Sequence, residues 1–318
     1  MSFSGKVKEE LGRHEDHARH CNIAEIAALL SGCADVLEDG EGRVSLIVHS
    51  ENETVIRKCF TILQKTFNIE EAFFSRDVYR EKRGRVYLLR ISSEHLAEIT
   101  KAARLTPDED RHTLICADTA LITQRECCKR AFVRGAFLAS GSISDPNKGY
   151  HFEIVFPDGE KAEQLQKIIC SFHIDARIVK RRNSYVVYVK EGAQIVDLLA
   201  LMGAGIALMD LENIRILKEM RNTVNRKVNC ETANINKTVG AAVKQMEDIR
   251  LIEKTRGFES LSDGLAEIAA LRLQYPEATL KELGMLLSPQ VGKSGVNHRL
   301  RKLSEIAQEL RENEEEQV

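Results

Sequence analysis

The sequence predicts an α+β protein in which a duplicated body is followed by an all-α domain. Three observations predict this class. The order helix, strand, helix, two strands, helix occurs in the first hundred residues and returns about 109 residues later. Each copy contains one helix that is rich in small apolar residues. From residue 233 onward the apolar periodicity is helical, and no alternating segment interrupts it.

The composition is that of an ordinary folded protein. The chain has 318 residues, 43% of them hydrophobic and 30% charged, which is enough for two or three domains. The net charge of −2 excludes a globally basic protein, so any nucleic-acid binding has to come from local patches. The 8 Cys form no CxxC pair, and there is no secretory signal or 18-residue apolar run. We therefore expect a reduced cytoplasmic protein that does not enter a membrane.

In the first copy, residues 1–104, the spacing of apolar residues predicts each helix and strand. Apolar residues at helical spacing predict a helix around Ile23–Ala34, and alternation predicts a strand over Arg43–His49. A helix with an apolar stripe is expected over Glu51–Phe67. Two strands joined by a charged hairpin follow over Ala72–Tyr79 and Arg85–Ile91, and then a short helix over Glu94–Ala103 that Ser93 would cap.

The second copy, residues 127–221, repeats that order. Its expected elements are a helix, a strand, a helix, two strands and two further helices, over Cys128–Ser140, Tyr150–Phe156, Asp158–Phe172, Asp175–Lys180, Tyr185–Lys190, Ala193–Leu201 and Met209–Arg221. A polar linker, residues 105–126, is expected between the copies. A second polar linker is expected over 222–232, before a helical domain that occupies 233–318 and ends in an acidic tail.

Two nine-residue stretches occupy the same place in each copy: Ala24–Gly32 (AEIAALLSG) and Val133–Gly141 (VRGAFLASG). Glycine inside a helix costs about 1 kcal/mol against alanine, so Gly135 requires a packing reason. Small residues at matched positions favour two helices whose backbones approach closely. The alternative is a helix that merely contains glycine near its end.

Both stretches resemble the LAGLIDADG motif of homing endonucleases. In that family the eighth residue is an Asp or Glu that holds a catalytic metal, whereas here it is Ser31 in one copy and Ser140 in the other. The resemblance implies an endonuclease-like body without catalytic residues. Asp35 and Asp145 follow shortly after but lie out of the motif register, so a residual metal-dependent nuclease is the enzyme alternative.

The C-terminal domain contains a predicted helix-turn-helix. Thr279 would cap a short apolar helix with Glu282 three residues on, a turn over Ser288–Gly292 follows, and a second helix begins at Lys293. No acid occurs between residues 283 and 304. The alternative is a basic face on a plain helical bundle. The predicted DNA-contacting residues are Thr279, Lys293, Ser294, Asn297, His298, Arg299, Arg301 and Lys302.

Two predicted hairpins have basic tips at matched places of the two copies. In LAGLIDADG proteins a concave sheet holds DNA between such tips, although exposed turns are often charged without a function. The candidate secondary DNA contacts are Lys82, Arg83 and Arg85 in the first copy and Lys180, Arg181 and Arg182 in the second.

A group of possible metal ligands lies near the start of the chain: His14, His17, His20 and Cys21. Spacings of three would put the histidines near one helical face, but no second pair nearby in the sequence completes a tetrahedral site. We therefore expect a polar surface helix and no metal, and we expect Cys127 and Cys128 to be buried helix cysteines. No Gly-rich phosphate loop is present, so no cofactor is expected.

The chain as a whole resembles the WhiA family of bacterial regulators. The resemblance depends on MSFSGKVKEEL at the start, RGAFLASGSISDPNKGYHFEI at 134–154, NRKVNCETANINKTVGAAVKQMEDI at 225–249 and the segment 265–310. It implies a protein that binds double-stranded DNA in transcription control, sporulation, cell division or chromosome segregation, and that associates with the nucleoid. Other regulatory or division proteins are possible partners of the body. Its internal pseudo-symmetry favours a monomer.

Overall fold

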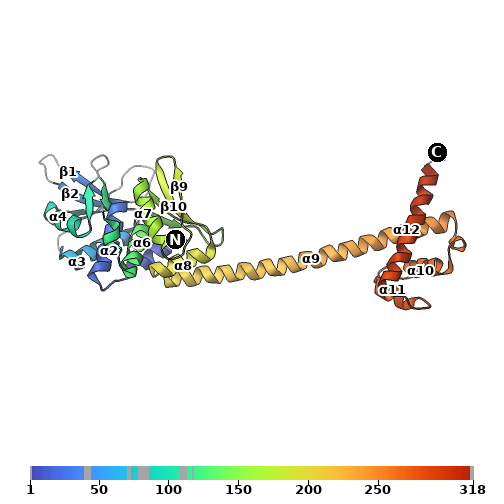
Figure 1. Ribbon diagram of the computed structural model, residues 1–318. Coiled ribbons are helices and arrows are strands. Elements are labelled where there is room, and N and C mark those ends of the chain that lie inside the picture. Colours follow the sequence, from blue (N-terminus) through green and yellow to red (C-terminus); the bar gives the residue numbers. More distant parts are fainter. Residues whose placement is uncertain are drawn as a thin grey trace. The chain divides into compact units, whose positions relative to one another are not determined.

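The computed structural model describes residues 2–38, 44–69, 73–77, 86–107, 113–116 and 118–315. The chain divides into two compact units, Met1–Glu219 and Met220–Val318. The first unit contains two antiparallel four-stranded sheets with their helices, and the second is helical throughout its described part (Figure 1). The predicted α+β class is therefore confirmed.

The first half of the body forms one antiparallel sheet with strand order β1-β2-β4-β3. Its helices are α1 (Phe3–Arg13), α2 (Arg19–Cys33), α3 (Glu53–Phe67) and α4 (Ser93–Ala102), and its strands are β1 (Ala34–Glu38), β2 (Val44–Ser50), β3 (Phe73–Asp77) and β4 (Val86–Ile91). The N-cap of α4 is Ser92, one residue before the predicted Ser93.

The second half repeats this arrangement strand for strand, with the order β7-β8-β10-β9. Its elements are α6 (Glu126–Ser140), β7 (Gly141–Ile143), β8 (Phe152–Phe156), α7 (Gly159–Cys170), β9 (Arg177–Arg181), β10 (Ser184–Val189) and α8 (Gly192–Met202). Sequence periodicity missed β1 and β7, because each is only three to five residues long and starts immediately after a helix.

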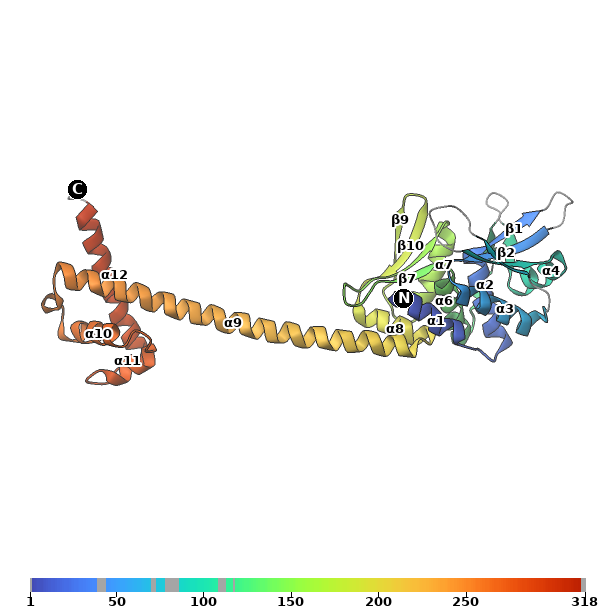
Figure 2. The ribbon, with the colours of Figure 1, turned by 180° about the vertical axis from the view of Figure 1, so that it is seen from behind.

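Helices α2 and α6, which carry the two motif copies, lie side by side between the two sheets (Figures 1 and 2). The packing explains the small residues. A Cβ at Gly135 would collide with the carbonyl oxygen of Glu25, and a Cβ at Gly32 would lie 2.7 Å from that of Ala139. The predicted close helix pair is confirmed, because only residues without bulk permit this approach.

The polarity of residues 105–126 predicted a linker, but most of this segment is folded. It forms an antiparallel pair of short strands, β5 (Leu105–Pro107) and β6 (Leu114–Cys116), and a short helix, α5 (Thr119–Ile122). Leu105 and Leu114 are buried. One buried apolar residue in β5 and two in β6 were too short a signal to outweigh the polar residues between them.

Residues 222–232 were also predicted to be a linker, and they are helical. They lie inside α9 (Gly205–Thr255), which has neither proline nor glycine between its first residue and Gly240. Their side chains are exposed. The polarity of this stretch therefore reflects a solvated helix and not a break in one.

The second unit packs the end of α9 against α10 (Asp263–Gln274), α11 (Leu280–Leu286) and α12 (Lys293–Glu315), with a 3-10 turn, η1 (Phe258–Ser260), before α10. Its core is an apolar cluster of Ile249, Ile252, Leu265, Ile268, Ala269, Leu283, Leu287, Val296, Leu300, Leu303, Ala307 and Leu310. Among the described residues, no helix has the length and apolar character that crossing a bilayer requires.

Candidate nucleic-acid interface

The turn between α11 and α12 is held by specific hydrogen bonds. The Thr279 side chain accepts a bond from the Glu282 N–H (3.3 Å), and the Glu282 carboxylate accepts one from the Thr279 N–H (2.7 Å), which forms a capping box. The Val291 N–H donates to the Gly284 carbonyl (3.0 Å), at a place where a Cβ on Gly284 would collide with Val291. The start of α12 is therefore firmly placed against α11.

Helix α12 has one buried face and one open face. Val296, Leu300 and Leu303 are buried in the core of the unit. The exposed side chains near its start are Lys293, Ser294, Asn297, His298, Arg301 and Lys302. Arg301 pairs with Glu305 at 3.3 Å, but its side chain remains 78% exposed, so this pair holds it only weakly.

Arg299 differs from the other predicted DNA contacts because it packs inside the unit. It lies three residues after Val296 and four before Leu303, which places it beside the buried stripe. Its Nη1 donates to the Gly264 carbonyl of α10 at 3.3 Å, and the side chain is half-buried. The Thr279 hydroxyl is also used within the unit, because it accepts the capping hydrogen bond of α11.

The basic hairpin of the second half is exposed as its sequence suggested. Arg182 has a positive φ of 50° at the turn between β9 and β10. The Lys180 ammonium lies 5.4 Å from the centre of the Tyr185 ring, and Arg181 donates to Glu153 at 3.1 Å. The matching predicted tip, Lys82, Arg83 and Arg85, lies outside the described residues.

Glu153 interrupts the basic surface of the second sheet. Its carboxylate also lies 3.0 Å from His151 Nε2 and accepts a bond from the Ser142 hydroxyl at 3.3 Å. Burial raises the pKa of Glu153, but the hydrogen bond and charge of His151 and the charge of Arg181 together hold it below its usual value. This face is therefore mixed in charge, unlike the start of α12.

The C-terminal ends of α2 and α6 are where an endonuclease would hold its metal. Ser31 is buried and donates to the Ala28 carbonyl at 3.0 Å, and its own carbonyl accepts a bond from Lys161 of α7 at 3.0 Å. A cavity of about 700 Å³ opens beside these ends, and Gly32, Gly141 and Lys8 are among its lining residues. Burial lowers the pKa of Lys8. The eighth position of neither motif copy supplies a carboxylate, the usual protein ligand of a divalent cation, although Glu9, Glu51 and Glu53 line the same cavity.

A buried charge network, which the sequence analysis missed, joins the two halves near the middle of the helix pair. Arg134 donates to Glu25 at 2.8 Å and to Asp16, and Lys58 lies 3.6 Å from Glu25. Glu25 is completely buried. Both Glu25 and Arg134 are second in their motif copies, so opposite charges at one repeat position were the signal.

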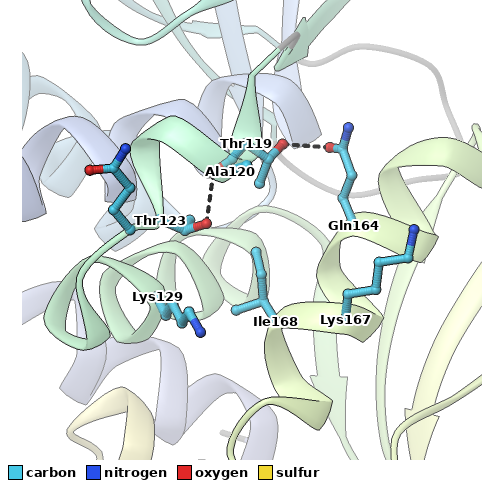
Figure 3. A pocket seen from close by; sticks show the side chains of 8 residues that line it. Thr119, Ala120, Thr123, Lys129, Gln164, Lys167 and Ile168 are labelled. Carbon is cyan, nitrogen blue, oxygen red and sulfur yellow. Dashed lines mark hydrogen bonds between the residues drawn. The ribbon is translucent and has the colours of Figure 1, made fainter.

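A pocket of about 460 Å³ lies between α5, α6 and α7 (Figure 3). The Thr119 hydroxyl donates to Gln164 of α7 at 2.7 Å, and the Thr123 hydroxyl donates to the Thr119 carbonyl at 2.7 Å. The ionisable residues of its lining are Lys129 and Lys167. These contacts attach α5 to the second half and form no catalytic group.

The structure corrects the interpretation of the N-terminal histidines. Residues 14–17 are not helical, so His14, His17 and His20 do not share a helical face. His20 and Cys21, which begin α2, instead meet Cys127 and Cys128 of α6. The sequence analysis found no second pair because this one lies more than a hundred residues away. Burial raises the pKa of the Cys21 thiol to about 12.

Comparison with known proteins agrees with this architecture. The chain matches the family models described as the WhiA N-terminal LAGLIDADG-like domain over residues 19–106, the WhiA LAGLIDADG-like domain over 129–221, and the WhiA C-terminal HTH domain over 224–307. Curated relatives named "Probable cell division protein WhiA" include one from Lachnoclostridium phytofermentans, which is 55% identical over 98% of this chain and 100% of that protein.

A second such relative, from Lachnospira eligens, is 48% identical over 98% of both chains. Among solved structures, the crystal structure of full-length DUF199/WhiA from "Thermatoga maritima" matches with a TM-score of 0.59 and 25% identity, covering 97% of this chain and 99% of that one. The fold and the helix-turn-helix thus define a protein with a duplicated LAGLIDADG-like body and a helix-turn-helix domain. The chain belongs to the WhiA family.

Proposed function

We propose that this chain is a non-enzymatic DNA-binding regulator that reads double-stranded DNA through the start of α12. The observation that carries the proposal is the open face of that helix. It presents Lys293, Asn297, Arg301 and Lys302 to solvent, directly after a turn that hydrogen bonds hold in place. A helix so placed after a short support helix is the arrangement that enters the major groove in helix-turn-helix proteins.

The exposed residues divide into two chemical roles. Lys293 and Lys302 suit phosphate oxygens, which position the protein and make its affinity depend on salt. Asn297 suits adenine and Arg301 suits guanine, because each can form two hydrogen bonds to that base. Arg299 and Thr279 act indirectly in this proposal, since their polar groups already bond within the unit.

The proposal includes the absence of nuclease activity. The motif positions hold Ser31 and Ser140, and the lysine Lys8 lines the neighbouring cavity. Mg²⁺ binds proteins mainly through carboxylates, so the two serines remove its usual ligands from the motif positions. In this proposal the body adds DNA contacts through Lys180 and Arg182, or binds another protein.

The biological process is proposed from the family. The printed name of the relatives supports a role in cell division. Control of sporulation and chromosome segregation are finer assignments of the same proposal, as is association with the nucleoid. The proposed domains are the two halves, residues 1–104 and 127–221, and the DNA-binding domain, residues 233–318. We propose that the chain acts as a monomer.

The test measures DNA binding by the full chain on genomic fragments across a salt series. Arg301→Ala/Lys302→Ala should bind all fragments more weakly, with the slope of log affinity against log salt reduced by about one to two. Asn297→Ala should instead lose preference among fragments. Arg250→Ala/Lys254→Ala removes the same charge from exposed positions of α9 and serves as the control.

Two results would overturn the proposal. If Arg301→Ala/Lys302→Ala keeps the affinity and salt slope of the original chain, α12 is not the DNA-reading helix. If the original chain cuts DNA in Mg²⁺ or Mn²⁺, the protein is an enzyme.

A further inference from the structure

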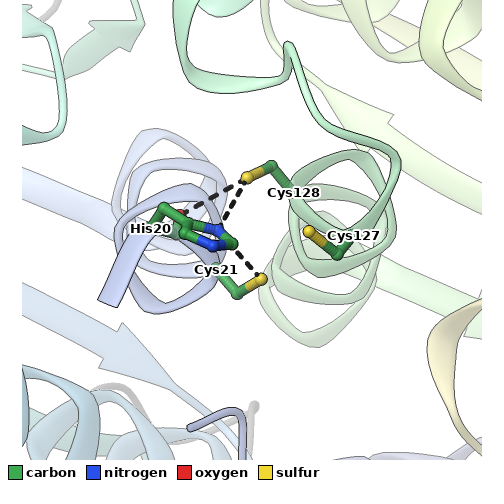
Figure 4. A group of neighbouring side chains, drawn as sticks. All are labelled: His20, Cys21, Cys127 and Cys128. Atoms are coloured by element: carbon green, nitrogen blue, oxygen red, sulfur yellow. Dashed lines mark hydrogen bonds between the residues drawn. The ribbon is translucent and has the colours of Figure 1, made fainter. Parts of the chain in front are cut away.

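Four potential metal ligands converge where α2 and α6 begin. His20 and Cys21 come from the first turn of α2, and Cys127 and Cys128 come from the first turn of α6 (Figure 4). Their ligand atoms all lie within 4.8 Å of one another. In Figure 4 the four side chains point into the space between the two helices.

The spacing of these atoms suits a tetrahedral ion. His20 Nδ1 lies 3.2 Å from the Cys128 sulfur and 3.3 Å from the Cys21 sulfur. A tetrahedral zinc site with ordinary bond lengths has nitrogen–sulfur separations of about 3.6 Å and sulfur–sulfur separations of about 3.8 Å. The two nitrogen–sulfur separations would therefore lengthen by a few tenths of an ångström around an ion at the centre, and the remaining pairs, all within 4.8 Å, would close by at most about 1 Å.

We propose that His20, Cys21, Cys127 and Cys128 form a zinc site that joins the two halves of the body. Three thiolates and an imidazole are the ligands of structural zinc and not of magnesium or calcium. All four coordination positions are filled by the protein, which is the closed arrangement of a structural ion. The site lies about 16 Å along the helices from Ser31, so it is separate from the motif ends.

The other buried cysteines show what thiols without a metal role look like in this fold. Cys33 donates to the Leu29 carbonyl at 3.2 Å, and Cys116 donates to the Ala103 carbonyl at 3.9 Å. Neither belongs to a group of ligands among the described residues. The cluster differs from them because its thiols face an imidazole and one another across two helices.

The role of the ion follows from where its ligands are attached. One pair belongs to the first half and the other to the second, and the segment between them is more than a hundred residues long. A shared ion crosslinks the starts of α2 and α6. Because the unfolded chain cannot present the four ligands together, metal binding stabilises the folded body.

The test begins with the metal content of the full chain after reconstitution with Zn²⁺ under reducing conditions and removal of excess metal. We expect one zinc per chain. Co²⁺ in its place should give the visible absorption of a tetrahedral, sulfur-rich site. Cys127→Ser and Cys128→Ser should each lower retained zinc at least tenfold. Cys127 is exposed, so its substitution leaves the core intact even if Cys128→Ser fails to fold.

Two matched variants control for the loss of a thiol. Cys170→Ser and Cys230→Ser remove exposed cysteines outside the cluster and should retain one zinc per chain. Removal of zinc with a chelator should lower the melting temperature of the original chain and of both controls, and should leave that of Cys127→Ser unchanged.

Three results would overturn the proposal. One is a folded original chain that retains less than a tenth of an equivalent of zinc. Another is zinc retention by Cys127→Ser and Cys128→Ser equal to that of the controls. The third is a disulfide between Cys21 and either α6 cysteine that persists under the reducing conditions of the assay.

Discussion

The two ends of the α2–α6 pair have opposite chemical character. At the C-terminal ends, Ser31 and Ser140 stand where the endonuclease motif has acids, and the contacts are between small residues. At the N-terminal ends, a group of thiols and an imidazole crosses between the helices, and a buried ion pair crosses nearer the middle of the pair. Between these two ends the helices pack closely. The comparison teaches that the packing of this motif is separable from its chemistry.

The largest effect should come from breaking the buried ion pair near the middle of the helix pair. Arg134→Met leaves the buried carboxylate of Glu25 with only Lys58 nearby, at 3.6 Å. The free energy of unfolding should fall by about 3–5 kcal/mol, because the buried carboxylate loses its hydrogen-bonded partner and keeps only the more distant ammonium of Lys58. Urea unfolding followed by circular dichroism measures this change.

Arg130→Met is the matched control for that variant. Arg130 lies one turn earlier on the same helix and pairs with Glu126 at 2.5 Å, but both side chains are more than half exposed. Its loss should cost less than about 0.5 kcal/mol. A cost for Arg134→Met as small as that of the control would show that the network does not join the halves.

A smaller effect should come from the packing between the ends. Gly135→Ala places a methyl group against the Glu25 carbonyl and should cost about 1–3 kcal/mol by overpacking. Gly240→Ala, in α9, has nothing within 4 Å of the added Cβ and should stabilise its helix by about 0.5–1 kcal/mol. Thermal unfolding of both variants checks the prediction. Stabilisation by Gly135→Ala would mean that the helices are farther apart than described.

The smallest effect should come from restoring acids at the C-terminal ends. Ser31→Asp/Ser140→Asp should not create DNA cleavage in Mg²⁺, because neither Ser31 nor Ser140 is among the residues that line the cavity, so the two new carboxylates would not converge on an ion in it. Incubation with supercoiled plasmid and Mg²⁺ or Mn²⁺ measures this. Cleavage by the double variant, and none by the original chain, would show that two side chains alone separate this body from a nuclease.

Much of the fold could be predicted from periodicity, and the exceptions share a cause. Helices α3, α6 and α7 and strand β2 appear where their apolar spacing indicated, within one to two residues at most ends. The misses were short strands such as β1 and polar segments such as 222–232, where a few residues carry too little pattern. The local sequence pattern is weak for short strands, which form by pairing with a neighbouring strand, and for solvent-exposed helices, which have no apolar stripe.

The duplication, the capped helix-turn-helix and the absence of an acid at the eighth motif positions could be predicted without the fold, because each depends on residue type at a regular spacing. Which distant side chains meet could be seen only once the helices were packed. The parallel packing of α2 and α6 brings His20 to Cys128 and Glu25 to Arg134. The packing of α12 on α10 likewise turns Arg299 inward. Spacing along a chain describes one element at a time, whereas a site between two elements depends on how their faces dock.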